Sequence, residues 1–431
     1  MIGTGALDYL GTAAQIGRRV IESAIWHEDR CNWLGAEPLE RWDGVTQAGV
    51  TYRTLGPDLY SGTSGVALFL AELFGVTREP AVRRTALGAM RHALARADSV
   101  SDSARLGLFS GWIGLALASV RVGMILEEPE LAERARRRLQ SCIAEKRGAH
   151  DFDLMSGRAG AIAGLAVLST VLEDSFVLDF AVRLGDELLK SAERAEIGYS
   201  WQSRTVENHR NLTGFSHGAS GAGYALLELF QLTGVSKYRD AALRAFEYER
   251  HWFDSKVGNW PDFRKDPLSP QRKKRYDCLS YWCHGAPGIA LARLRAYEIL
   301  NDETCLAEAL TAMATTRAEM VSALENGTGN FSLCHGLAGN SEAVLYGAEL
   351  LLTRRGEDIA PVFEAACYGI ERYARPDAAW PCGTHSGETP NLMLGLAGIG
   401  HYYLRLYRQS IPSILILRRN AWKEAALRKS A

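Results

Sequence analysis

A short glycine pattern that recurs seven times constrains the fold of this 431-residue chain more than any other feature. Each copy reads G-x-x-G and stands directly before an apolar run, as in SGTSGVALFLAELF, which begins at Ser61. The first glycines of the copies are residues 62, 111, 157, 218, 285, 336 and 395, so the successive spacings are 49, 46, 61, 67, 51 and 59 residues. Periods of this size are typical of repeat proteins, in which no unit buries its apolar face alone.

The segments around the glycine patterns predict two kinds of helix. The run after each pattern is apolar nearly all round, which is typical of a helix buried on most sides. Charged segments with helical spacing lie between the copies, for example residues 81–97, 131–145 and 238–252. Alternation of period two is nearly absent, so we expect an all-α chain. Inner and outer helices that alternate in this way predict an α/α toroid, a double ring of seven inner and seven outer helices with the G-x-x-G turns at one end.

The repeats also divide the chain into three parts. We interpret residues 1–50 as a helical lead-in, residues 51–420 as the toroid, and residues 421–431 as a basic C-terminal tail. A second basic segment, residues 264–275, is interpreted as solvated surface, with a docking surface for an acidic peptide as the alternative.

Composition excludes several classes of partner. The formal net charge is −1, which argues against nucleic acid. The longest uncharged stretches have about 14 residues and are shorter than the roughly 18–20 that span a bilayer. The N-terminus lacks the basic and apolar regions of a signal peptide. We therefore expect a cytoplasmic protein whose eight cysteines are free thiols or metal ligands.

Functional side chains directly precede four of the glycine turns. They are Asp153, His217, the pair Cys283-His284 and the pair Cys334-His335. The turns LYSG, LFSG and LMLG carry no such group and show what the scaffold alone requires. If all repeats have the same phase, the functional side chains converge on one mouth of the barrel.

The two Cys-His pairs predict a zinc site. Three protein ligands with a fourth position open is the pattern of catalytic zinc, whereas structural zinc usually has four protein ligands. We assign Cys283, Cys334 and His335 as the ligands, although His284 could replace His335 as far as spacing is concerned. The alternative is that the cysteines are buried apolar residues and the histidines are satisfied by the backbone.

These motifs also carry a family resemblance. The stretches GFSHGASGAGYALLEL, WCHGAPGIALARL, SLCHGLAGN and NLMLGLAGIGHYYLRL resemble lanthionine synthetase C-like cyclases, especially the cyclase domain at the C-terminus of bifunctional lanthipeptide synthetases. The likeness runs from about Asp58 to about Leu417. It implies an α/α toroid with one zinc ion, and it implies that Cys283, Cys334 and His335 are the ligands.

The resemblance further implies a reaction. The family adds a cysteine thiol of a ribosomal precursor peptide to a dehydroalanine or dehydrobutyrine, which forms a thioether ring. His217 and Asp153 match residues implicated in catalysis in the family. Imidazole titrates close to working pH, so His217 is the expected acid–base group, either for the thiol proton or for the proton that the enolate takes up. The alternative role for Asp153 is as a cap for the following helix.

The chain departs from the family pattern in three respects. Cyclases that act alone often carry an arginine where this chain has Leu279, so the group that stabilises the enolate is left unassigned. Cys382 and His385 have no matching role and are interpreted as structural. Only about fifty residues precede the toroid and no P-loop motif is present, so we expect a dehydratase acting in trans, or an excised domain, and no ATP chemistry.

Two other functions share some of these features. Protein prenyltransferase β-subunits are toroids whose zinc activates a peptide thiol, but the adjacent Cys-His pair argues against that class. Other members of the resembled family handle glutathione or other thiols, or act as scaffolds, without cyclising peptides.

Overall fold

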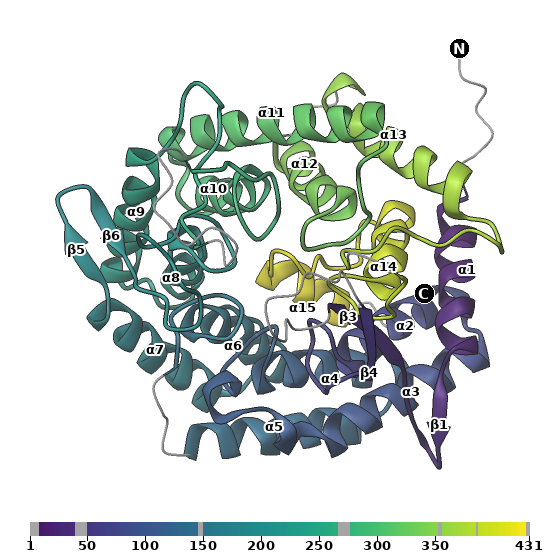
Figure 1. Cartoon of the computed structure of the whole chain (residues 1–431). Helices are drawn as coiled ribbons and strands as arrows, with labels where there is room; N and C mark the ends of the chain where they lie inside the picture. The colour runs from purple at the N-terminus through teal and green to yellow at the C-terminus, as the bar shows by residue number, and fades with distance from the viewer. Residues whose placement is uncertain are drawn as a thin grey trace, which may run out of the picture.

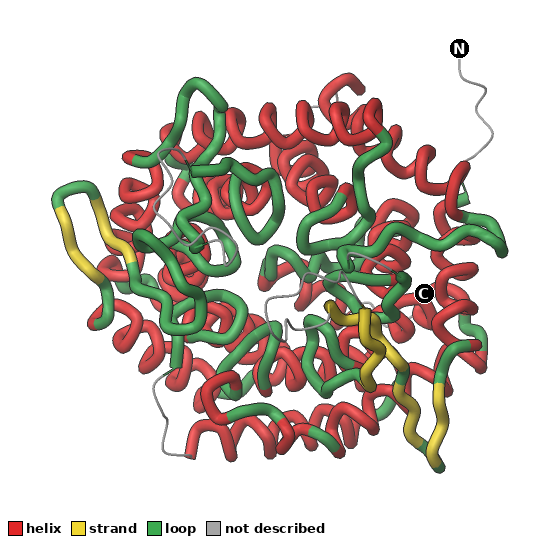
Figure 2. The backbone as a smooth tube through the Cα atoms, in the orientation of Figure 1, coloured by secondary structure: helices red, strands yellow, loops and turns green. Residues whose placement is uncertain are grey.

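The computed structural model describes residues 8–38, 50–144, 150–265, 276–351, 356–384 and 387–427. These residues form fifteen α-helices, fourteen of which make two concentric rings (Figures 1 and 2). The inner ring consists of α2 (Thr63–Thr77), α4 (Trp112–Leu126), α6 (Arg158–Leu172), α8 (Ala219–Thr233), α10 (Ala286–Leu300), α12 (Leu337–Leu351) and α14 (Leu396–Tyr407). The outer ring consists of α3 (Pro80–Ala95), α5 (Pro129–Ala144), α7 (Ser175–Lys190), α9 (Ser236–His251), α11 (Glu303–Asn326), α13 (Gly356–Tyr373) and α1 (Tyr9–Glu22). The predicted α/α toroid is confirmed.

The seventh outer helix comes from the N-terminal part of the chain. Six outer helices follow an inner helix in sequence, but α14 has no such successor. Instead α1, which falls within the predicted lead-in, packs against α14 and lies between α13 and α3 in the outer ring (Figure 1). The two ends of the chain therefore meet to close the double ring.

The burial of the helices follows their composition. Helix α2 is buried at every position from Thr63 to Leu73, because neighbours surround it on most sides. Helix α5 is instead buried at Leu131, Ala135, Leu139 and Cys142, a spacing that places these side chains on one face. The difference between buried inner helices and amphipathic outer helices was predictable from the sequence.

Three short hairpins were not predicted. They pair β1 (Ile25–His27) with β2 (Arg30–Asn32), β3 (Leu34–Pro38) with β4 (Val50–Thr54), and β5 (Glu193–Ala195) with β6 (Gly198–Ser200), all antiparallel. Strands of three to five residues are too short to show a convincing alternation of side chains.

The second glycine of each G-x-x-G is required by close packing. A Cβ atom added there would lie 1.7 to 2.3 Å from the carbonyl oxygen six residues earlier, in all seven repeats. For example, a Cβ on Gly114 would lie 1.7 Å from the oxygen of Leu108. Each inner helix thus begins directly against the turn that leads into it, which leaves no room for a side chain.

The residues two positions before the first glycines form a belt of backbone hydrogen bonds. They are Tyr60, Phe109, Met155, Ser216, Cys283, Cys334 and Met393. The amide of each bonds to the carbonyl of the next turn at most junctions: Tyr60 to Phe109 (2.9 Å), Phe109 to Met155 (3.0 Å), Ser216 to Cys283 (3.2 Å), Cys334 to Met393 (3.0 Å) and Met393 to Tyr60 (3.0 Å). Between turns three and four the amide of Leu154 replaces that of Met155 (2.9 Å to Ser216). The turns therefore lie side by side around one end of the barrel.

The segment after α14 fills the centre of the ring. The hydroxyl of Tyr224 on α8 donates to the carbonyl of Leu417 (3.0 Å), and the indole of Trp282 donates to that of Leu415 (3.1 Å). Helix α15 (Arg419–Leu427) follows and accepts a hydrogen bond from Arg121 on α4 (2.9 Å, to Ala425). Across the described ranges, no helix has the length and apolar character needed to cross a membrane.

Candidate functional site

Two cysteine sulfurs from neighbouring turns meet at the mouth of the ring. The side chains of Cys283 and Cys334 are close enough to change each other's pKa, and Cys334 is 5% exposed. Interaction with Cys334 and burial raise the pKa of Cys283 well above its usual value. Interaction with Cys283 outweighs the effect of burial on Cys334 and lowers its pKa. The two neighbouring sulfurs therefore differ in their affinity for a proton.

His335 lies beside this sulfur pair with one ring nitrogen already satisfied. Its Nε2 is 2.9 Å from the carbonyl oxygen of Gly383, and a carbonyl can only accept, so Nε2 carries the proton. Nδ1 is then the nitrogen available to a metal. The imidazole is close enough to Cys283 for its charge to lower the pKa of that thiol. A histidine ligand usually donates its second N–H to a carbonyl or carboxylate in this way.

His284, the alternative ligand, has different neighbours. It is 2% exposed, its ring stacks on that of His217 (5.8 Å between centroids), and its Nδ1 lies 4.0 Å from Asp262. Neither ring nitrogen has a hydrogen-bond partner among the described residues. Burial lowers the pKa of His284 to about 3, so the ring is neutral.

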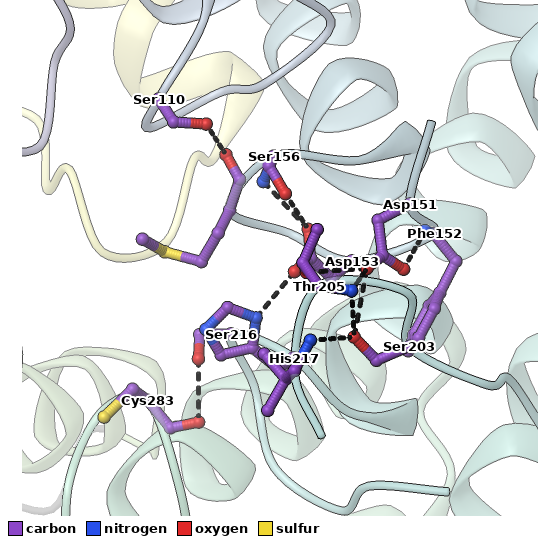
Figure 3. Close-up of polar contacts among 12 residues, drawn as sticks. Ser110, Asp151, Phe152, Asp153, Ser156, Ser203, Thr205, Ser216, His217 and Cys283 are labelled. Carbon is purple, nitrogen blue, oxygen red and sulfur yellow. Dashed lines mark hydrogen bonds and ion pairs between the residues drawn. The ribbon is translucent and has the colours of Figure 1, made fainter. Parts of the chain in front are cut away.

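Asp153 and His217 form a close pair near Cys283 (Figure 3). Nδ1 of His217 is 2.6 Å from Oδ2 of Asp153, which is fully buried, while the imidazole is 21% exposed. Burial lowers the pKa of His217, but the hydrogen bond to Asp153 and the charges of Asp153 and Cys283 outweigh it, so that the pKa is raised. The bond to Asp153 holds the proton on Nδ1 and leaves Nε2 available to a substrate.

Asp153 does not cap the following helix, which was its alternative role. The N-cap of α6 is Gly157, and no side chain bonds to the first amides of that helix. Oδ1 of Asp153 instead accepts the backbone amide (2.8 Å) and the hydroxyl (3.2 Å) of Ser156, which fixes the turn before the helix. One oxygen therefore stabilises the turn and the other orients the imidazole.

Arg264 brings a positive charge to the sulfur pair, although no motif in the sequence marked it as a site residue. Asp262 holds the guanidinium in a fork, with Nε 2.9 Å and Nη2 2.6 Å from its Oδ2. The charge of Arg264 lowers the pKa of both cysteine thiols. Arg264 opens the basic segment 264–275, most of which (266–275) lies outside the described residues. The sequence signal for Arg264 was therefore a cluster of basic residues, and such a cluster is equally typical of solvent-exposed surface.

The interpretation that the LYSG turn carries no functional group is corrected, because Tyr60 in this turn lies near Cys334. Its hydroxyl is close enough to Cys334 to lower the pKa of that thiol, and its ring meets Phe109 edge to face (6.4 Å). Tyr60 occupies the same position, two before the first glycine, as Cys283 and Cys334. That shared position was the signal that could have identified it.

The two residues without a family role, Cys382 and His385, precede turn seven in the sequence. Cys382 is 6% exposed, its sulfur lies 4.0 Å from the carbonyl of Thr389, and burial raises its pKa to about 12. It is a protonated, buried thiol in a neighbouring loop. His385 lies outside the described residues.

The donor set is compatible with zinc. Two neighbouring cysteine side chains and an imidazole with its second nitrogen satisfied match the ligand types of a catalytic zinc site. Within the described ranges, however, no three histidine, cysteine, aspartate or glutamate side chains lie close enough together to hold a metal ion in their present positions. The candidate site is thus a converged sulfur pair with His335 beside it.

Comparisons with known proteins agree with the fold. The chain is 23% identical over 398 residues to the lacticin 481/lactococcin biosynthesis protein LcnDR2 of Lactococcus lactis subsp. lactis; the match covers 89% of this chain but only 38% of that protein. It is 24% identical to glutathione S-transferase LANCL1 of Danio rerio, with 79% of each covered. The structure of nisin cyclase matches with a TM-score of 0.60 at 18% identity, covering 86% of this chain and 92% of that one.

A family model identifies the chain more directly. The model of the lanthionine synthetase C-like proteins matches residues 53–416. That range contains all seven glycine turns, the sulfur pair and the Asp153–His217 pair. The chain belongs to the lanthionine synthetase C-like family.

Proposed function

We propose that this protein is a zinc-dependent lanthipeptide cyclase. It would add peptide cysteine thiols to dehydroalanine or dehydrobutyrine and so form lanthionine and methyllanthionine rings. The observation that carries the proposal is the convergence of the Cys283–Cys334 sulfur pair with the Asp153–His217 pair at one mouth of the toroid. Family membership and the resemblance to nisin cyclase in fold support it.

The proposed zinc ligands are Cys283, Cys334 and His335. Bound there, zinc would supply a Lewis acid that keeps the substrate sulfur deprotonated at neutral pH. Tyr60 would hold the Cys334 sulfur through its hydroxyl, and Gly383 would hold the imidazole of His335. The carbonyl of Gly383 also fixes the tautomer of His335 in which Nδ1 would be available to bind zinc.

The covalent step requires one group that transfers protons and another that stabilises the negative charge of the enolate. The substrate sulfur forms a bond to the β-carbon, the alkene π pair moves to the carbonyl as an enolate, and a proton then adds to the α-carbon. No group leaves and nothing is oxidised. His217 would transfer protons through Nε2, because Asp153 occupies Nδ1.

Arg264 is the proposed partner of the enolate oxygen. It would take the role left unassigned because this chain has Leu279 where cyclases that act alone often carry an arginine. Its guanidinium is held by Asp262, and its side chain is 37% exposed at the mouth. Among the described residues its Nη1 makes no hydrogen bond, so one donor remains for a substrate. A positioned donor of this kind stabilises charge that develops in the transition state.

The substrate would be a precursor peptide already dehydrated at serine or threonine. Because this chain spans only 38% of LcnDR2, the dehydration step is assigned to a dehydratase domain or protein distinct from the toroid. We propose a cytoplasmic reaction, since free thiols persist there.

The first test is zinc content beside ring formation. The purified protein should contain about one zinc per chain and convert a dehydrated, cysteine-bearing peptide to a product of equal mass that resists thiol alkylation. Cys334→Ala should lose most of its zinc and all ring formation, while Cys305→Ala, which removes a buried thiol on α11, should keep both. A zinc-free parent that remains folded after zinc is supplied would refute the proposal.

Transfer of glutathione is the second candidate, favoured by the similarity to LANCL1 over 79% of both chains. The same sulfur pair could activate glutathione for addition to a dehydrated peptide. A dehydrated peptide without cysteine distinguishes the two functions. A glutathione adduct that forms on it as fast as rings form on the cysteine-bearing peptide would favour the second candidate.

A further inference from the structure

The belt of hydrogen bonds around the turns has one open junction. Backbone hydrogen bonds join successive turns at six of the seven junctions, with distances from 2.9 to 3.4 Å. Among the described residues, no backbone hydrogen bond joins the turn of Cys283 to the turn of Cys334, although both are described in full. The amide of Cys283 and the carbonyl of Cys334 would complete the pattern.

A local change in turn five explains the open junction. Gly285 has φ = +89° and is alone among the seven first glycines in the left-handed region. The turn closes on itself, since the amide of Tyr281 bonds to the carbonyl of His284 (2.9 Å) and Ser280 bridges to Gly285. An L side chain at Gly285 would be strained, and its Cβ would lie 1.6 Å from the carbonyl oxygen of Leu279.

Side chains cross the open junction where the backbone does not. The amide of Asn340 on α12 donates to the carbonyl of Ser280 (3.1 Å). The ring of Tyr281 meets that of His335 edge to face (5.6 Å between centroids). The third contact is the close approach of the Cys283 and Cys334 side chains.

We infer that a metal ion bound by Cys283 and Cys334 has a second, structural function: it closes the belt at the junction that the backbone leaves open. The inference rests on the proposed zinc site, but it does not depend on cyclisation. The two proposed sulfur ligands stand on opposite sides of the open junction, and bonds from both to one ion would join turns five and six. The left-handed turn at Gly285 then serves to direct Cys283 across the junction instead of presenting its amide to the next turn.

Local opening of the metal-free protein should therefore be concentrated at this junction. Proteins open in cooperative units, and those with few hydrogen bonds to their neighbours open most readily. A ligand that binds only the closed form suppresses opening by the factor 1 + [L]/Kd. Free zinc at 100 times its dissociation constant should slow such opening about 100-fold.

Hydrogen exchange measured by mass spectrometry on the full chain tests this inference. Zinc-loaded and chelator-treated protein are compared in peptides that cover residues 279–286 and 331–337. We expect zinc to slow exchange there about 100-fold and to leave residues 58–61 and 107–110 unchanged, because backbone hydrogen bonds already join those two turns. Uniform slowing, or none in a protein that has bound zinc, would overturn the inference.

Two variants sharpen the test. Asn340→Leu removes the side-chain hydrogen bond across the open junction, so the difference in exchange between metal-free and zinc-loaded protein should increase there. Ser216→Ala is the matched control, because it removes only the bond from a side chain to Cys283 (3.2 Å) at a junction that keeps its backbone bond. An equal effect of both variants would count against the inference.

The outcomes separate the two proposals. Failure of the parent to bind zinc would overturn both the proposed function and the inference. Zinc uptake and ring formation without local slowing would overturn the inference alone. Zinc uptake with local slowing but without ring formation would support the inference and count against the cyclase.

Discussion

Turns one and three of the ring have the same internal structure, yet only the aspartate of turn three belongs to the candidate site. In each, an aspartate four residues before the first glycine accepts the amide three residues later, from Ser61 to Asp58 (2.7 Å) and from Ser156 to Asp153 (2.8 Å). The neighbouring turns differ. Turn four offers His217 to Asp153, whereas turn two has Ser110 at that position, which contacts the carbonyl of Met155 (3.3 Å).

The two turns show that, of the Asp153–His217 pair, the aspartate also has a structural role. The aspartate stabilises the turn, and it is present both in turn three, where it belongs to the candidate site, and in turn one, where it does not. Burial raises the pKa of Asp58, and among the described residues its hydrogen bonds come from its own turn. Asp153 gains an imidazole instead, so the function of this turn depends on what its neighbour presents.

Replacing His217 by the scaffold residue should have the largest effect. His217→Ser gives turn four the serine that turns one to three carry at this position, so the ring should fold normally. The rate of ring formation should fall about 10²–10⁴-fold, because the acid–base group is lost. Mass spectrometry after thiol alkylation measures the rate, with Ser110→Ala as the control. A variant with the parent rate would show that His217 transfers no proton.

Removing the positive charge of Arg264 near the sulfur pair should have the next largest effect on ring formation. Arg264→Gln keeps hydrogen-bonding capacity but not the charge, and should lower kcat about 10²–10³-fold, as for the loss of one oxyanion donor. KM should change less than kcat if the enolate is the partner. Lys265→Gln is the neighbouring control, since Lys265 contacts Glu207 at the exposed surface. A change in KM alone would assign Arg264 to peptide binding.

The two aspartates should respond differently to substitution by asparagine. An amide can hold this turn, as Asn391 does for Leu394 in turn seven (2.9 Å). Asp153→Asn should slow ring formation by about 10²-fold, at the low end of the range for an acid–base group, while Asp58→Asn should leave the rate unchanged. Equal rates in the two variants would remove the distinction between the turns.

Stability against pH separates the same two variants. Because the pKa of His217 is raised, its pairing stabilises the fold fully below its ordinary value of 6.5 and is lost as the pH rises through the folded value. Asp153→Asn should abolish this dependence in urea unfolding. Asp58→Asn should not lower stability at neutral pH, since burial raises the pKa of Asp58 and disfavours its charged form.

The smallest expected effect concerns Tyr60, the functional residue of the otherwise structural turn one. Tyr60→Phe keeps the ring against Phe109 and removes the hydroxyl that lowers the pKa of the Cys334 thiol. Ring formation should slow by about 2–10-fold, the effect of one hydrogen bond. Tyr403→Phe, which removes a bond to the carbonyl of Ala366 (3.0 Å) on the outer ring, should keep the parent rate.

The sequence predicted the repeated elements well and the unrepeated ones poorly. The glycine turns revealed six of the outer helices and all inner helices, because each repeat restates the same pattern. Helix α1 follows no glycine turn, so nothing in the repeat pattern indicates that it completes the outer ring. The hairpins are short enough that their side chains show no usable alternation.

The candidate site divides in the same way. Asp153, His217, Cys283, Cys334 and His335 precede glycine turns, and their convergence follows from the common phase of the repeats. Arg264 comes from a connecting segment, and only the folded chain shows that Asp262 aims it at the sulfurs. Tyr60 does lie in a turn, but a tyrosine is equally suited to packing, and its contact with Cys334 depends on the closure of the ring between the last turn and the first.

The pairing of α1 with α14 limits how this architecture can vary. An open solenoid can gain or lose a repeat at its end without disturbing the others. Here the first helix shields the last, so an added repeat would have to widen the whole circle and alter every contact between neighbours. The two ends must also find each other across almost the full length of the chain, and such distant pairing slows folding. Substitutions in the loops and in the residues before each glycine leave these contacts between helices in place, and the candidate site takes its residues from those positions.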